Sequence, residues 1–153
     1  MSCIMWSHNA EEYPNWLTQL ESRRREIEEQ GVWWDVRWKL RRGLAFPIEG
    51  YIWNTVEGSI THSVEIGEGS KTFNQSERRL AVEMNENLGT LRIEDNYHSP
   101  LQEFLRHERS SLTRLKLIEI ERLTPEKALE DFRLRNGNIP KTGPRSFYWV
   151  MPV

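Results

Sequence analysis

A run of fourteen residues, "QGVWWDVRWKLRRG" at 30–43, places three tryptophans beside four basic side chains. Flat indole rings stack on nucleic-acid bases for about 1–3 kcal/mol per base, while arginines and lysines bind phosphates. Trp33 and Trp34 are adjacent, so in an extended segment they face opposite sides and only one can enter a given core. The other ring is a candidate stacking surface, with Arg37 and Arg42 as candidate phosphate contacts.

A second basic stretch lies near the carboxyl end of the chain. Residues 36–48 and 132–153 together hold eight of the 21 basic residues and no acid, although the net charge is -2. Lys141 and Arg145 belong to the second stretch. Brought together by folding, the two stretches would form a basic face for a phosphate-bearing ligand. The alternative is two solvated stretches that pair with the many glutamates.

The other chemistry-bearing residues lack the spacing of a catalytic or metal site. No metal-binding pair occurs among the four histidines, and the single cysteine cannot complete a structural zinc set. The segment "GEGSKT" at 67–72 lacks the spacing of a phosphate loop, and no GxSxG elbow occurs. We therefore expect a binding module that is not an enzyme and carries no metal or cofactor.

Composition favours a single soluble globular domain. A chain of 153 residues with 29% charged residues is long enough to bury one core without disulfides. No basic segment followed by an apolar run marks a secretion signal, and Cys3 has no cysteine partner, so a cytoplasmic protein without membrane contact is expected. Because the chain ends on the strand-like "YWVMPV", we expect residues 1–153 to be one domain excised from a longer polypeptide.

Apolar periodicity predicts the elements that must position these residues. Strands are expected at 2–7, in a hairpin at 51–66 that turns at Glu57-Gly58, at 80–84, at 112–123 and at 146–153. Helices are expected at 13–30, from Ser99-Pro100, and at 124–132, with loops at 67–77 and 133–146. The apolar positions change register between Leu117 and Ile118, which predicts a bulge. The fold class is α/β of the α+β type, with a curled or barrel-like mixed sheet and helices outside.

The order of these pieces resembles the EVE and YTH branch of the PUA-like fold, whose members read modified bases. The matching segments, over most of the chain, are "CIMWSHN", "GVWWDV", "GYIWNTVEGSITHSVEI" and "LKLIEIERLTPEKALEDFRLRNGNIPKTGPRS". The resemblance implies a PUA-like sheet or barrel with flanking helices.

The resemblance also implies a base-binding site. Trp33 matches the family's tryptophan that stacks on the flipped base, with Trp34 beside it, and "SHN" matches the strand exit that contacts the base edge. That exit comprises Ser7, His8 and Asn9. Lys141 and Arg145 match the phosphate-binding loop. The family's second cage tryptophan has no counterpart in residues 67–110; Tyr97 is the candidate substitute, with Phe73 or Phe104 as alternatives.

The function implied by this resemblance is recognition of N6-methyladenine in duplex DNA by base flipping, as the targeting module of a McrB-type modification-dependent restriction system. A GTPase of the AAA+ class would then follow in the full-length protein. Three alternatives stay open. The module could read methylated RNA, it could be an ASCH-like RNA-processing enzyme that uses Lys39, Lys71 or Lys141, or it could be a protein-interaction domain whose tryptophans all lie in the core.

Overall fold

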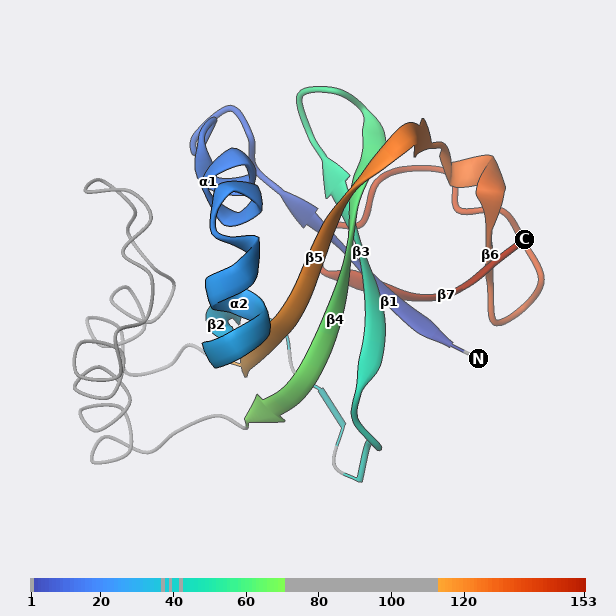
Figure 1. Ribbon diagram of the computed structural model, residues 1–153. Coiled ribbons are helices and arrows are strands. Elements are labelled where there is room, and N and C mark those ends of the chain that lie inside the picture. Colours follow the sequence, from blue (N-terminus) through green and yellow to red (C-terminus); the bar gives the residue numbers. More distant parts are fainter. Residues whose placement is uncertain (1, 37, 39, 42, 71–112) are drawn as a thin grey trace, which may run out of the picture.

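One curled, mixed sheet forms the body of the molecule (Figure 1). The computed structural model describes residues 2–36, 38, 40, 41, 43–70 and 113–153. Within these residues the sheet has seven strands in the order β2-β5-β4-β3-β1-β7-β6. The strands are β1 (Cys3–His8), β2 (Val32–Val36), β3 (Ile48–Asn54), β4 (Ser59–Ser70), β5 (Thr113–Lys127), β6 (Phe132–Leu134) and β7 (Phe147–Pro152).

The expected strand at the amino end, the hairpin and the final strand are confirmed as β1, β3–β4 and β7. The hairpin turns through Gly58, whose φ of 63° lies in the region that glycine tolerates best. β1 runs parallel to β3, whereas β7 runs antiparallel to β1 on its other side. The carboxyl ends of β1 and β3 therefore meet at the same edge of the sheet.

The predicted bulge is also confirmed. Glu65 of β4 pairs with Glu119 of β5, but the next β4 residue, Ile66, pairs with Leu117, so that Ile118 has no partner in the register. This extra residue lets Leu117 and Ile120 both be buried, although they lie three positions apart on a strand. A loop was expected to begin at residue 67, but β4 continues to Ser70, because the long β5 supplies partners for it.

The helix expected at 13–30 is two short helices, α1 (Trp16–Ser22) and α2 (Arg24–Gln30), which lie along one side of the sheet (Figure 1). The chain breaks at Arg23, whose backbone φ of -112° is not helical. Leu20 and Ile27 are buried on either side of this break, and a continuous helix would place arginines between them on the buried stripe. Among the described residues, neither helix has the length and apolar character needed to cross a membrane.

The helix expected at 124–132 is wrong. β5 continues through Lys127, which pairs with Ile60 at the start of β4, and only the 3-10 turn η1 (Leu129–Asp131) follows. Ser59 donates a hydrogen bond of 3.0 Å to Glu126, which fastens this extension to the hairpin. Pairing with β4 satisfies the backbone groups that a helix would have satisfied internally. The expected strand at 80–84, the helix from Ser99 and residues 71–77 of the loop lie outside the described residues.

Two apolar clusters pack against the sheet. The larger one lies between the sheet, the helices and β2, and it contains the buried rings of Trp6, Trp16 and Trp34. The smaller one includes Met5, Tyr51 and Phe132 and is covered by the segment around β6. The curl of the sheet brings the segment after β2 to β7, since Trp38 packs on Phe147 with 4.5 Å between ring centroids. The sheet is curled but open, with β2 and β6 as its edge strands, in agreement with the curled mixed sheet that was expected.

Two glutamates that face each other across β4 and β5 predict a stabilising substitution. Glu65 and Glu119 are direct register partners, and a hydrogen bond with Glu65 raises the pKa of the Glu119 carboxyl. Like charges in such a pair are destabilising, so Glu119→Lys should stabilise the fold by about 0.2–1 kcal/mol at pH 7. A raised pKa means that ionisation disfavours the folded state, so the wild type recovers this stability as the pH falls through that pKa. Thermal melts at pH 7 and pH 4 measure both effects.

Glu121→Lys is the matched control, because Glu121 lies on the same strand but opposite Ser63. A melting temperature that rises equally for both variants would assign the gain to net charge rather than to the Glu65–Glu119 pair. An advantage of Glu119→Lys that persists undiminished at pH 4 would contradict the carboxylate repulsion.

Candidate nucleic-acid interface

The loop between β6 and β7 is fastened to the common carboxyl edge of β1 and β3. Ser7 of β1 lies opposite Trp53 of β3 in the parallel register. Its hydroxyl donates a short hydrogen bond of 2.5 Å to the carbonyl of Pro144, which lies next to Arg145. The structure thus brings the predicted strand exit and the predicted basic loop together at one edge of the sheet.

Gly143 allows the loop to lie directly on an indole ring. A Cβ atom at this position would meet Nε1 of Trp53 at a separation closer than real contacts allow. Tyr148 donates a further hydrogen bond of 3.1 Å to the carbonyl of Thr142. Three successive loop residues are therefore anchored, although most of the surrounding side chains are exposed.

The basic side chains of this carboxyl-terminal segment have no carboxylate partner in the part of the chain that the structure describes. Arg133 donates to the backbone carbonyls of Glu130 and Phe132, at 2.7 and 2.9 Å, and forms no ion pair there. Arg135, Lys141 and Arg145 are exposed, and no ion pair involves them among the described residues. In contrast, Arg24 and Arg122 do pair with glutamates. Within the described residues, these cations are therefore not paired with glutamates.

His8 at the end of β1 is buried and neutral. Only 5% of the residue is exposed, and this burial lowers its pKa to about 4. Nε2 lies 3.1 Å from the carbonyl oxygen of Tyr13, so Nε2 carries the proton and Nδ1 is left as an acceptor. Asn9 follows it on the surface, where its side chain bonds the backbone and the carboxylate of Glu12. Neutral donors and acceptors therefore mark this strand exit.

Trp34 is a core residue, which corrects its assignment to base contact. Only 5% of it is exposed, and its ring meets Trp6, His8 and Trp16 edge-on at centroid distances of 5.4, 5.7 and 5.6 Å. A base could reach this indole only by displacing rings that are themselves buried. The contact with His8 nevertheless shows that β2 crosses close to the strand exit.

Trp33 lies in β2 opposite Lys116 of β5. The structure describes its backbone position; its side chain lies outside the described residues. The remaining candidate residues that lie wholly outside the described part of the chain are Tyr97, Phe73, Phe104, Arg37, Arg42, Lys39 and Lys71. Of the three lysines considered for catalysis, Lys141 is described, and it is exposed.

Sequence reasoning missed an aromatic surface on β7. Phe147 and Trp149 lie on one face of this strand, and Trp38 packs against Phe147. The guanidinium of Arg135 lies 5.1 Å from the centroid of the Trp149 ring. The available signal was the alternation of two large rings in "FYWVM" directly after a basic loop. Trp149 and Trp53 are half-buried, whereas Trp16 is buried in the core.

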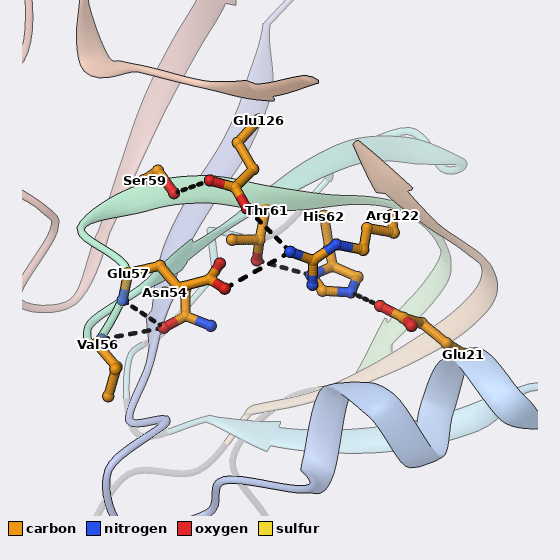
Figure 2. Close-up of polar contacts among 9 residues, drawn as sticks. All are labelled: Glu21, Asn54, Val56, Glu57, Ser59, Thr61, His62, Arg122 and Glu126. Atoms are coloured by element: carbon orange, nitrogen blue, oxygen red, sulfur yellow. Dashed lines mark hydrogen bonds and ion pairs between the residues drawn. The ribbon is translucent and has the colours of Figure 1, made fainter. Parts of the chain in front are cut away.

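A polar network connects α1 to the hairpin (Figure 2). His62 donates from Nε2 to the Glu21 carboxylate and accepts at Nδ1 from the Thr61 hydroxyl, 2.7 Å away. Burial lowers the pKa of His62, while the hydrogen bond to Glu21 opposes that shift. A hydroxyl, an imidazole and a carboxylate in sequence have the composition of a catalytic triad, but Thr61 is 0% exposed. The chain of bonds therefore fastens helix to sheet and offers no nucleophile to a substrate.

Arg122 completes this network on the surface. Its guanidinium lies 2.9 Å from Glu126 and 3.6 Å from Glu57, and Figure 2 shows both contacts beside the hairpin turn. The Asn54 side chain accepts from the backbone amides of Val56 and Glu57, at 3.0 and 3.1 Å. These bonds hold the hairpin turn next to the carboxyl edge of β1 and β3.

One hollow on the surface of the described residues is unsuited to phosphate. It measures about 400 Å³ and lies over β3, β4 and β5, with four glutamates in its lining: Glu49, Glu65, Glu119 and Glu121. Its charge would repel an anionic ligand. Among the described residues, no group of three histidine, cysteine or acidic side chains is placed to hold a metal ion.

No protein-family model matches the sequence, and no curated protein matches it either. Among solved structures, the chain is similar to a mutant form of the ZmASCH protein from Zymomonas mobilis. The TM-score is 0.58 with 11% sequence identity, over 97% of this chain and 89% of that chain. At this identity the likeness concerns the fold, and it supports the expected PUA-like α+β architecture.

Proposed function

We propose that this chain is a non-catalytic nucleic-acid-binding module that reads a single base. The observation that carries the proposal is the anchored loop of residues 135–146, whose cations have no carboxylate partner among the described residues. Exposed cations on an anchored loop attract phosphates, and phosphate contacts supply most of the affinity of nucleic-acid binders. The PUA-like fold is consistent with this role.

The base would be read beside the strand exit. His8 is neutral and Asn9 is exposed next to it, so a bound base would meet neutral hydrogen-bond groups once the Asn9 amide leaves the Glu12 carboxylate. Trp33 is the ring that we assign to stacking, because the resemblance matches it to the stacking tryptophan and its neighbour Trp34 is buried in the core. Lys141 and Arg145 would hold the flanking phosphates. Stacking gives affinity, while edge hydrogen bonds give base identity.

N6-methyladenine in duplex DNA is the target that we propose, within a McrB-type restriction system whose AAA+ GTPase would act on other domains. Transfer of one methyl group from water into an aromatic wall contributes about 0.8 kcal/mol. Extrusion of the base from a duplex costs a few kcal/mol, which stacking and phosphate contacts can offset. The resemblance to EVE and YTH modules supports this assignment, and a methylated RNA target is the alternative.

The test uses two pairs of fluorescent duplexes, one pair of DNA and one pair of RNA. The two members of each pair differ only in one N6-methyl group. Binding is measured by anisotropy at two salt concentrations, with Trp33→Ala and Trp33→Phe beside the wild type. We expect both DNA duplexes to bind more weakly at high salt while the methyl preference persists, because only the phosphate term depends on counterion release. Equal affinity for both members of the DNA pair would refute base reading, and a preference confined to RNA would select the alternative target.

A further inference from the structure

Three half-buried rings that contact one another lie beside the proposed interface. This surface, which we call the β7 aromatic surface, consists of Trp38, Phe147 and Trp149. Trp38 and Phe147 are tilted by 32° to each other, with 4.5 Å between centroids, whereas Phe147 and Trp149 meet edge-on at 6.1 Å. Each ring contacts the larger apolar cluster on one side, yet none is fully buried.

The surface begins next to the strand exit. In the antiparallel register Phe147 lies opposite Trp6, the residue before Ser7, and Trp149 lies opposite Ile4. The backbone positions of Phe147 and Trp149 are therefore about 7 Å apart along the strand. Of the two residues, Trp149 lies farther from the place where we expect the base to be read. A nucleic-acid strand bound at the strand exit would pass over this surface with its next nucleotide.

Arg135 adds a positive charge to the end of the surface. Its guanidinium lies 5.1 Å from the centroid of the Trp149 ring, at a distance typical of a cation–π contact. The side chain is exposed and forms no ion pair among the described residues. A guanidinium that rests on an indole keeps its flat outer face and its N–H groups available to a ligand, and bases stack on such planes as they do on aromatic rings.

The combination selects a ligand that is both planar and anionic. An aliphatic protein surface could pack on the rings but would leave the cations, which have no carboxylate partner among the described residues, without a counter-charge. An acidic peptide could pair with the cations but has no planar group to stack on the rings. We propose that the β7 aromatic surface, together with Arg135, binds an unpaired nucleotide adjacent to the base that is read. The inference rests on the proposed function and adds to it that the flanking nucleotide must be unstacked from its neighbours.

The experiment uses two single-stranded DNA 7-mers with one N6-methyladenine in the centre. In one of them the nucleotides on either side of the methyladenine are replaced by abasic residues, which keep every phosphate and remove only the flanking bases. For the wild type we expect the intact oligonucleotide to bind about 5- to 100-fold more tightly, the effect of one base stack. In Trp149→Ala this difference should fall below about 2-fold, while affinity for the abasic oligonucleotide stays near that of the wild type.

Two further variants separate stacking from stability. Trp149→Phe retains a ring and should restore part of the difference. Arg135→Gln leaves the packing of the strand intact, and it should reduce the difference even if Trp149→Ala proves unfolded by its melting curve. Arg24→Gln, on α2 and paired with Glu28, is the matched charge control and should keep the full difference.

The outcomes distinguish this inference from the proposed function. A wild type that binds the methylated oligonucleotide but shows the same intact-to-abasic difference in Trp149→Ala and Arg135→Gln would overturn the flanking-nucleotide site alone. A wild type that has equal affinity for intact and abasic oligonucleotides would overturn it as well. A wild type that binds neither oligonucleotide would overturn the proposed function and this inference with it.

Discussion

Replacement of Trp34 by alanine should destabilise the fold by about 3–5 kcal/mol, the cost of deleting a large ring from a packed core. Trp34 is 5% exposed and stands at the centre of three edge-on contacts, with Trp6, His8 and Trp16. Its removal would leave a cavity between β1, β2 and α1, which cannot collapse easily because each ring is held by its own element. The corresponding decrease in melting temperature is roughly 6–20 °C, measured by circular dichroism or calorimetry.

The half-exposed Trp53 provides the comparison. Trp53→Ala removes a ring of the same size from a site with less burial, so a smaller decrease in melting temperature is expected. Nucleic-acid binding by Trp34→Ala, measured well below its melting temperature, should stay within a few-fold of the wild type. An unchanged melting temperature together with a loss of methyl preference would restore Trp34 to the base-binding site and remove it from the core.

The second large effect concerns the carboxyl-terminal cations. In the triple variant Arg135→Gln, Lys141→Gln and Arg145→Gln, the dependence of log affinity on log salt should become shallower by about 3, since each phosphate contact contributes about 0.9. If the affinities of variant and wild type converge near 1 M salt, the variant is weaker by roughly 500-fold at about 0.1 M. The melting temperature should hardly change, because all three side chains are exposed and none forms an ion pair among the described residues.

A matched triple variant removes the same charge elsewhere. The control carries Arg23→Gln, Arg24→Gln and Arg25→Gln. These three arginines lie around the junction of α1 and α2, and Arg24 pairs with Glu28. This control should preserve nearly all of the salt dependence. If both triple variants lose affinity equally, binding depends on net charge and the anchored loop is not its site.

The two variants test different parts of the same argument. Trp34 concerns the core that places β2 against the strand exit, and the three cations concern the loop that Ser7 and Gly143 hold at that exit.

Much of the local structure could be predicted from residue order alone. The alternation in β1, β7 and the hairpin identified those strands, and the change of register at Leu117 and Ile118 predicted the bulge. Such patterns are readable because each depends on one face of one element meeting the core. The chemical composition of the basic loop at residues 133–146 was also visible in the sequence, although its anchors were not.

Tertiary structure alone decided which residue of each candidate set is buried. Local patterns allowed Trp33 and Trp34 equally to enter the core, and the choice of Trp34 depends on rings from β1 and α1 that are distant in sequence. The break at Arg23 and the strand in place of a helix at 124–127 have the same origin, because the partner on β4 or in the core outweighs the helical preference of the segment. Arg135 became a candidate contact only when the fold placed it on Trp149, fourteen positions away in the chain. Sequence therefore determined most of the elements and their charges. The packing of the curled sheet against distant segments determined which side chains remain available to a ligand.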